Sequence, residues 1–264
     1  MYPVINIFGR EITTYAICAL IGILLSGFLM CKLTGLAVKD ENDTIILLAI
    51  ISVGVLLGGH ILFALTNIDR FSLFVEIKSL SDLFNAVQQV FGGAVFYGGL
   101  IGGIIFGFVG AKILKVDVVS FLDIAGIGVP LFHAIARVGC FLGGCCYGIE
   151  SDFGFTAYGN QLVEAVNGIS RFPVQLLEAL CNLIIFLLIF VLYHREKLKG
   201  KLFYLYLILY SIVRFFDEFL RGDEIRGFIF GISTSQFISI CLFIFALIVF
   251  LKPKKTISCD DRNL

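Results

Sequence analysis

The chain has 264 residues, of which 59% are hydrophobic and 15% are charged, and its formal net charge is zero. Soluble domains are typically about 45–50% apolar and about 25% charged, so this composition excludes an ordinary soluble protein. The zero net charge also gives no electrostatic basis for a nucleic-acid partner. The composition therefore predicts a protein embedded in membrane lipid.

Seven segments are long and apolar enough to form spanning helices, which need about 20 residues. In chain order they are Ile12–Cys31, Thr44–Leu65, Gly92–Leu114, Val119–Leu142, Val174–Tyr193, Leu202–Phe219 and Ile232–Leu251. The first is too long for the apolar region of a signal peptide, so we expect no cleavage. These segments predict an all-α, polytopic membrane protein of about seven transmembrane helices, forming a single domain over residues 1–264.

The distribution of Lys and Arg between alternate loops predicts the orientation. One set of loops and ends carries twelve such residues and the other carries six. The first set is Lys32, Lys39, Lys112, Lys115, Arg195, Lys197, Lys199, Lys201, Lys252, Lys254, Lys255 and Arg262. The second set is Arg10, Arg70, Lys78, Arg171, Arg221 and Arg226. Because the richer set is expected in the cytoplasm, the N-terminus is predicted outside and the C-terminus inside.

Two loops on the predicted outer side are long enough to hold structure. The loop at about 67–91 has apolar residues at helical spacing, which predicts a helix lying in the membrane interface. The loop at 143–172 is polar and contains glycines, and we expect it to form a small extracytoplasmic cap.

The third segment carries many glycines, with Tyr97, Gly98 and Gly99 at its predicted outer end. Glycines on a spanning helix permit close helix packing. They equally let backbone amides approach a phosphate or a glycerol group. The Tyr97 hydroxyl could donate a hydrogen bond to a substrate oxygen, so both interpretations stay open.

Ionisable residues in the remaining segments mark a candidate site, because charge inside a membrane is costly. His133 and Arg137 lie four residues apart in the fourth segment, and Gln175 and Glu178 follow Pro173 in the fifth. His133 alone is equally consistent with a core residue whose hydrogen bonds are satisfied. Arg137 has no acidic residue on its own helix turn to neutralise it.

The sixth segment carries four polar residues at spacings of four, four and three, namely Tyr210, Arg214, Glu218 and Arg221. This spacing predicts one helical face. An Arg214–Glu218 pair could simply satisfy itself, but it leaves the tyrosine and the third charge unexplained. Two arginines with carboxylates behind them favour a lipid phosphate, because a guanidinium binds two phosphate oxygens and keeps its charge.

Three of the eight cysteines, Cys140, Cys145 and Cys146, form a cluster in the sequence. A disulfide from Cys140 to Cys145 or Cys146 suits an oxidising compartment. Free structural thiols, a functional thiolate and a metal ligand are the alternatives. A zinc site would need a fourth ligand, which the sequence does not identify, so no metal is predicted.

Several of these motifs, taken in order, resemble the prolipoprotein diacylglyceryl transferase family. The matching positions are Tyr15, Gly98-Gly99-Leu100-Ile101-Gly102, Arg137-Val138-Gly139, Arg171-Phe172-Pro173-Val174-Gln175-Leu176-Leu177-Glu178, and Tyr210 with Arg214, Glu218 and Arg221. The resemblance implies transfer of the diacylglyceryl group of phosphatidylglycerol to the lipobox cysteine of prolipoproteins. It places the protein in the bacterial cell (inner) membrane, among membrane lipids, and implies no cofactor. The alternatives are a lipid transferase with another acceptor and a non-enzymatic lipid-binding or transport protein.

The resemblance also implies roles for individual residues. Arg137 and Arg214 would bind and polarise the phosphate-bearing head group, and Glu218 and Arg221 would orient Arg214. Tyr15 and Tyr210 would line the substrate site, with Gly98 and Gly99, while Gln175 and Glu178 would order the cleft. Tyr97 and Cys145 stand where the family usually has His and Glu. The general base is therefore open, with His60 and His133 as candidates.

Overall fold

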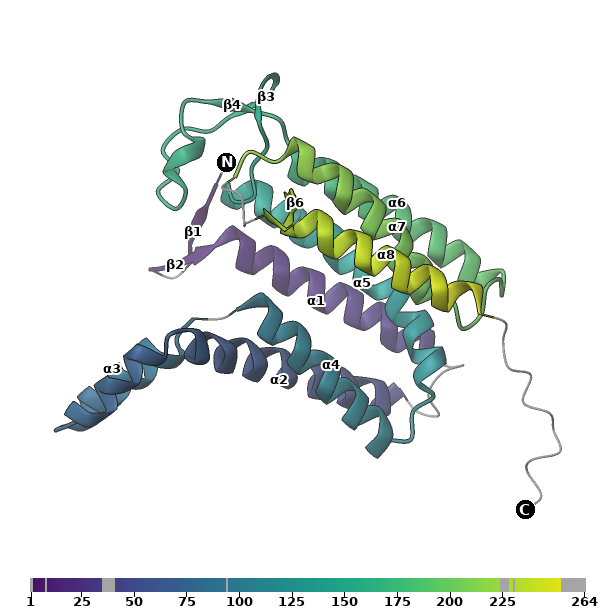
Figure 1. Ribbon diagram of the computed structural model, residues 1–264, viewed down its shortest axis with the longest axis horizontal. Coiled ribbons are helices and arrows are strands. Elements are labelled where there is room, and N and C mark those ends of the chain that lie inside the picture. The colour runs from purple at the N-terminus through teal and green to yellow at the C-terminus, as the bar shows by residue number, and fades with distance from the viewer. Residues whose placement is uncertain are drawn as a thin grey trace. The chain divides into compact units, whose positions relative to one another are not determined.

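The computed structural model describes residues 2–7, 9–34, 41–93, 95–223, 228–229 and 231–252 (Figure 1). The chain divides into two compact units, which are described separately below. One unit comprises Met1–Leu29 and Leu122–Leu264, and the other comprises Met30–Phe121.

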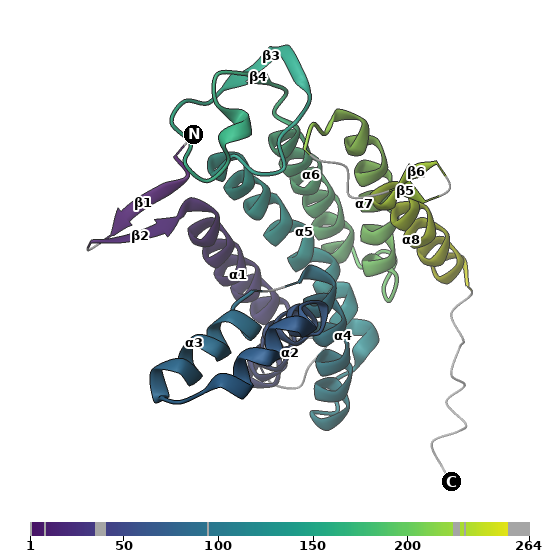
Figure 2. The ribbon, with the colours of Figure 1, turned by 60° about the vertical axis from the view of Figure 1, so that its left-hand side comes forward.

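The first unit is built on five helices. They are α1 (Thr14–Leu33, up to residue 29), α5 (Val118–Gly143, from residue 122), α6 (Val174–His194), α7 (Leu202–Asp217) and α8 (Thr234–Leu251). Helix α7 packs against both α6 and α8, and the three lie side by side in Figures 1 and 2. Helix α8 begins with a capping box, in which Ser233 and Gln236 satisfy each other's backbone N–H groups.

A buried carboxylate fixes the start of α7 against α5. Asp123 on α5 accepts hydrogen bonds from the backbone N–H of Leu202, at 2.9 Å, and from that of Gly200. These N–H groups have no partner within α7, and a carboxylate also suits the positive end of the helix dipole. The contact therefore sets the height of α7 along α5, and with it the height of the polar residues that α7 carries further on.

The second unit consists of α2 (Glu41–Thr66), a 3-10 helix (Ile68–Glu76), α3 (Leu80–Phe91) and α4 (Phe96–Ile113). Helices α2 and α4 touch backbone to backbone. A Cβ atom on Gly98 would lie 2.2 Å from the carbonyl oxygen of Gly58, and one on Gly102 would lie 2.1 Å from that of Gly54. Only glycine fits such an approach, so these glycines serve helix packing.

Five helices are long and apolar enough to cross a membrane, counted over the described residues: Thr14–Leu33, Asn42–Thr66, Val118–Gly143, Val174–His194 and Thr234–Leu251. A shorter apolar helix covers Gly98–Ile113. The protein is therefore a polytopic membrane protein. Helices occupy all seven predicted segments, but α7 has only 16 residues, so the number of seven spans stays a prediction. The single-domain prediction also stays untested.

The structure is mostly helical, whereas the sequence predicted an all-α protein. Three two-stranded antiparallel sheets add to the helices in the described part of the chain. They pair β1 (Val4–Ile7) with β2 (Arg10–Thr13), β3 (Glu150–Thr156) with β4 (Ser170–Arg171), and β5 (Phe228–Ile229) with β6 (Ile232–Ser233). These strands are short and lie between helices, where apolar periodicity gives little signal.

Both loops predicted to be structured are folded. Loop 143–172 contains β3, β4 and a 3-10 turn at Glu164–Val166, organised around the buried side chain of Asn160. Loop 67–91 contains α3, so the prediction of a helix there is confirmed. On which side of a membrane these loops lie, and whether α3 lies in the interface, stay predictions.

Candidate functional site

The centre of the candidate site is Glu178, on the first turns of α6, which is only 2% exposed. Its Oε1 atom lies 2.9 Å from Nη2 of Arg137 and 3.7 Å from Nε2 of His133, both on α5. A buried charge requires a partner. Arg137, which has no acidic residue on its own helix turn, is therefore neutralised from the neighbouring helix.

The side chain of the second arginine, Arg214 on α7, is 11% exposed, against 14% for Arg137. Its Nη2 atom lies 2.7 Å from Oε2 of Glu218 and donates a hydrogen bond of 2.9 Å to the Ser235 hydroxyl at the start of α8. The i,i+4 pair expected from the sequence is therefore present, with an additional contact to a second helix. These two contacts hold the guanidinium in one orientation.

Arg221 does not continue the polar face of α7, which is a correction to the sequence prediction. The α-helix ends at Asp217, a 3-10 turn covers Glu218–Leu220, and Arg221 has an extended backbone. Its Nε donates to Asp223 at 2.8 Å, and its backbone pairs with that of Gly148 in the cap. Arg221 therefore ties the end of α7 to the 143–172 loop.

Aromatic contacts link the two arginine-bearing helices. The His133 ring on α5 lies 4.9 Å, centroid to centroid, from the Tyr210 ring on α7, and Tyr210 stacks on Tyr206 at 5.7 Å. His133 lies within electrostatic reach of both Arg137 and Arg214. The structure thus gathers both arginines, His133, Tyr210 and Glu178 around one region of the first unit.

Each arginine keeps a buried N–H group with no hydrogen-bond partner. These groups are Nε of Arg137 and Nη1 of Arg214. Among the acceptors, Oδ2 of Asp217 is also buried without a partner. A buried polar group left in this way costs about 1–3 kcal/mol, and more when it is charged. The region is therefore suited to an anionic ligand, since such a ligand would satisfy the two free donors.

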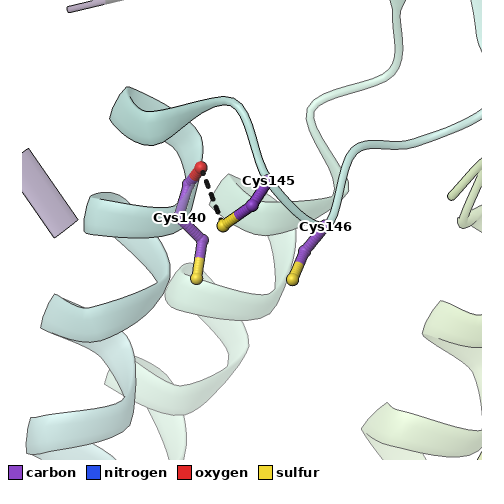
Figure 3. Close-up of side chains that lie close together, drawn as sticks. All are labelled: Cys140, Cys145 and Cys146. Atoms are coloured by element: carbon purple, nitrogen blue, oxygen red, sulfur yellow. Dashed lines mark hydrogen bonds between the residues drawn. The ribbon is translucent and has the colours of Figure 1, made fainter. Parts of the chain in front are cut away.

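The three clustered cysteines adjoin this region, at the end of α5 and in the turn that follows (Figure 3). Their sulfur atoms all lie within 4.8 Å of one another, and all three are free thiols in the structure. The Cys145 thiol donates to the carbonyl oxygen of Cys140 at 3.7 Å. Nη1 of Arg137 approaches the Cys140 sulfur at 3.9 Å, so the thiol cluster and the arginine site share a boundary.

The turn that carries Cys145 and Cys146 is firmly held. Gly144 has φ +83°, and a Cβ atom there would lie 2.2 Å from the amide nitrogen of Asn160, so the position requires glycine. The Asn160 amide donates to the Gly143 carbonyl at 3.1 Å, and Gln175 of α6 donates to the Cys145 carbonyl at 2.8 Å. Buried amides from two directions therefore fix the backbone between the thiols.

The environment distinguishes the two thiols of the turn. Hydrogen bonds from Cys140 and Cys145 lower the pKa of Cys146 against the effect of burial, with help from nearby Arg221 and Arg137. Hydrogen bonding to Cys140 and Cys146, together with burial, raises the pKa of Cys145. The cluster therefore favours one thiolate, centred on Cys146.

The other predicted site residues are placed as follows. Tyr15 lies in the first turn of α1, within electrostatic reach of Cys140, Cys145 and Arg137. Gly98 and Gly99 lie in the second unit, against α2, while the side chain of Tyr97 lies outside the described residues.

In the second unit, Nδ1 of His60 is hydrogen-bonded to the carbonyl oxygens of Phe91 and Gly93, at 2.7 and 2.8 Å. His60 therefore holds the connection between α3 and α4, a structural contact that the sequence did not indicate.

Sequence reasoning missed two residues that shape the site. Ser235 contacts Arg214, and Asn160 organises the turn that carries the cysteines. The run of polar residues at 233–236, ahead of an apolar helix, was the available signal for Ser235. Asn160 lies in a polar loop, where a single asparagine does not stand out.

This arrangement defines a polytopic membrane protein with two buried, paired arginines at one end of its helices. The family model of prolipoprotein diacylglyceryl transferase matches residues 3–252. The phosphatidylglycerol–prolipoprotein diacylglyceryl transferase of Clostridium tetani is 33% identical over 254 residues, covering 95% of this chain and 97% of that protein. A similarly named protein of Clostridium perfringens is 32% identical, covering 93% and 92%, and one of Finegoldia magna is 29% identical, covering 98% of both. The chain therefore belongs to the prolipoprotein diacylglyceryl transferase family.

Proposed function

We propose that this protein transfers the diacylglyceryl group of phosphatidylglycerol to the lipobox cysteine of a prolipoprotein. The products are a thioether-linked lipoprotein precursor and glycerol phosphate. Family membership supports the class of reaction. The observation that carries the proposal for this chain is the pair of buried, unpaired donors, Nε of Arg137 and Nη1 of Arg214.

The phosphate of the lipid would bind between these two guanidiniums. Each arginine has a carboxylate on one side of its fork, Glu178 for Arg137 and Glu218 for Arg214, which leaves other N–H groups for phosphate oxygens. Because the carboxylates hold the guanidiniums in place, little reorganisation is needed on binding. A guanidinium is preferred here over an ammonium, since its planar fork donates two parallel hydrogen bonds.

The acceptor sulfur would attack the glycerol carbon that carries the phosphate ester. The new S–C bond forms as the C–O bond breaks, and the electron pair of that bond leaves on the phosphate oxygen. Negative charge therefore increases on the phosphate in the transition state, where Arg137 and Arg214 stabilise it. The thiol proton goes to solvent or to a base, for which His133 is the candidate in the first unit.

The remaining residues would shape the substrate site. Tyr210 and Tyr15 line it, and the free Oδ2 of Asp217 is available to a glycerol hydroxyl of the head group. Glu178 and Gln175 order its walls, the first through Arg137 and the second through the cysteine turn. Tyr97, Gly98 and Gly99 of the second unit are assigned to the substrate by family resemblance alone.

The reaction requires a membrane setting, and we place the protein in the bacterial inner membrane with seven spans. Its N-terminus would lie outside, so that the arginines face the compartment to which the precursors are exported. The twelve-to-six distribution of Lys and Arg supports this orientation.

Complementation tests the proposal directly. A bacterial strain depleted of its own diacylglyceryl transferase would receive this gene, and the mass of a reporter lipoprotein would be read out. Restored growth with a diacylglyceryl mass increase on the reporter is the expected result. A reporter that stays unmodified, while the protein is present in the membrane, would contradict the proposal. Lipid attached to a different acceptor would point to a related transferase.

A further inference from the structure

The thiol cluster of Cys140, Cys145 and Cys146 has no role in the phosphate clamp, the name used here for Arg137 and Arg214, yet it contacts the clamp through Arg137. Among the described residues, these three form the one group of His, Cys, Asp or Glu side chains close enough together to hold a metal ion. One of the three is buried and two are half-buried. Three converging thiols at the edge of a charged site call for an explanation of their own.

We propose that Cys140, Cys145 and Cys146 bind one zinc ion, whose fourth position is open to the acceptor thiol of the transfer reaction. The role in catalysis rests on the function proposed above, whereas the binding of zinc does not. Zinc sites with four protein ligands are structural, while sites with three protein ligands keep a position for water or substrate. Within the described part of the chain no fourth side chain joins the three thiols, and such a set fits the second kind.

The distances suit a metal better than a disulfide. With zinc–sulfur bonds of about 2.3 Å, the sulfur atoms of a tetrahedral site lie about 3.8 Å apart. The three sulfur atoms are within 4.8 Å of one another, so rotations of the side chains can close the site around an ion. A disulfide needs two of the sulfurs about 2.0 Å apart and would leave the third without a function.

The surroundings are already organised for metal binding. Gln175 and Asn160 hold the turn between the ligands through its carbonyl groups, so the thiols are fixed from outside the cluster. Such outer contacts tune and stabilise metal sites. Arg137 approaches the Cys140 sulfur, and Arg221 lies within electrostatic reach of Cys146. Both guanidiniums would offset the negative charge of three thiolates around a divalent ion.

The zinc ion would supply a means of deprotonating the acceptor thiol that does not depend on a base such as His133. The lipobox thiol would displace water from the fourth position and lose its proton to solvent, because a zinc-bound thiol is deprotonated. Its sulfur would then attack the glycerol carbon, and the C–O bond to the phosphate would break as described above. The thioether formed is a weak ligand, so water would replace it and complete the cycle.

The size of this effect can be bounded. A free cysteine thiol has a pKa of about 8.5, so about 3% of it is thiolate at pH 7. Full deprotonation would therefore raise the rate up to about thirtyfold at pH 7. The benefit would shrink above pH 8.5, where the thiol ionises without help.

The experiment uses the full chain purified in detergent, with zinc measured by mass spectrometry of the metal. We expect about one zinc per chain, lost in Cys145→Ser but kept in Cys241→Ser, whose cysteine is exposed on α8 and outside the cluster. Replacement by cobalt gives a readout independent of activity. Its thiolate absorption should increase with a lipobox peptide but not with the same peptide carrying serine for cysteine.

A second test uses the wild-type protein and therefore does not depend on whether the cysteine variants fold. Chelation followed by cobalt addition should protect the three thiols from alkylation. Chelation should also lower transfer up to about thirtyfold at pH 7, and much less at pH 9.

Protein isolated without zinc that fails to bind cobalt, or that contains a disulfide within the cluster, would overturn the metal site. Unchanged transfer after complete zinc removal would overturn its role in catalysis and leave the proposed transferase intact. Stoichiometric zinc in a protein that transfers nothing would overturn the proposed function and leave the metal site intact.

Discussion

Replacing Arg214 by lysine is the sharpest test of the phosphate clamp. Lysine keeps the positive charge, so the pair with Glu218 can persist, but a single ammonium cannot also reach Ser235 and a phosphate in fixed directions. The variant should therefore insert and fold while losing at least one charge-assisted hydrogen bond to the phosphate. Such a bond is worth about 1.5–3 kcal/mol, which corresponds to a decrease in rate of roughly tenfold to more than a hundredfold.

Purified variants would be assayed with labelled phosphatidylglycerol and a lipobox peptide. The matched control is Arg70→Lys, an exposed arginine of the second unit, which should transfer at the wild-type rate. If Arg137 and Arg214 contact one phosphate, the double lysine variant should lose less than the product of the two single losses. A protein with both Arg214→Gln and Glu218→Gln distinguishes phosphate binding by Arg214 from a purely structural pair with Glu218. Wild-type transfer by that protein would refute the reasoning, because it keeps a hydrogen-bonded pair without any charge.

Three further predictions test the topology and the local energetics. A reporter fused after Lys254 should be cytoplasmic and a tag inserted at exposed Tyr158 should be accessible outside; protection of the tag in right-side-out vesicles would contradict the orientation. Glu178→Gln should leave a buried guanidinium without its counter-charge and destabilise the protein by about 3–5 kcal/mol, seen as a lower unfolding temperature in detergent; an unchanged temperature would show that the pair is dispensable. The pKa of Asp82 is lowered by hydrogen bonds from Ser79 and a backbone amide, so its contribution to α3 is present above its ordinary pKa and lost as pH falls through the lowered value. The hydrogen-exchange protection of α3, corrected for the intrinsic exchange rate, should therefore fall on acidification at a higher pH in Ser79→Ala than in the wild type, and identical profiles would contradict this.

Long apolar runs predicted the helices well because lipid leaves the backbone few alternatives. Helix ends were less predictable. The sixth segment was expected to continue to Phe219, whereas the α-helix ends at Asp217 and tightens into a 3-10 turn. The backbone of Arg221 pairs with that of Gly148 in the 143–172 loop, and this pairing ends the helix. A pairing between segments so far apart in the sequence leaves no periodic signal. The small sheets escaped prediction because their strands are short and lie between helices.

The sequence predicted which residues belong to the candidate site, but not all of the contacts between them. Buried charge in an apolar segment identified Arg137 and Arg214, since so few other reasons exist for a charge there. The sequence could predict the carboxylate partner of only one of these two arginines. Glu218 is a local partner at i,i+4, while Glu178 reaches Arg137 from a different helix. Only the tertiary fold brings Glu178 of α6 next to Arg137 of α5, and no local sequence pattern predicts that contact.

The sequence predicts that the arginines are kept while Tyr97 and Cys145 stand where the family usually has His and Glu, and the energetics make such a division reasonable. The arginines act on charge that develops on the phosphate, and each lost contact costs about one to two orders of magnitude in rate. A base acts on a thiol that is already about 3% ionised at pH 7, so it can contribute at most about thirtyfold. Replacing the base therefore costs less in rate than replacing one of the arginines. A cluster in which Cys145 joins two other thiols beside Arg137 offers one such replacement, because a metal-bound thiol needs no carboxylate or imidazole to remove its proton.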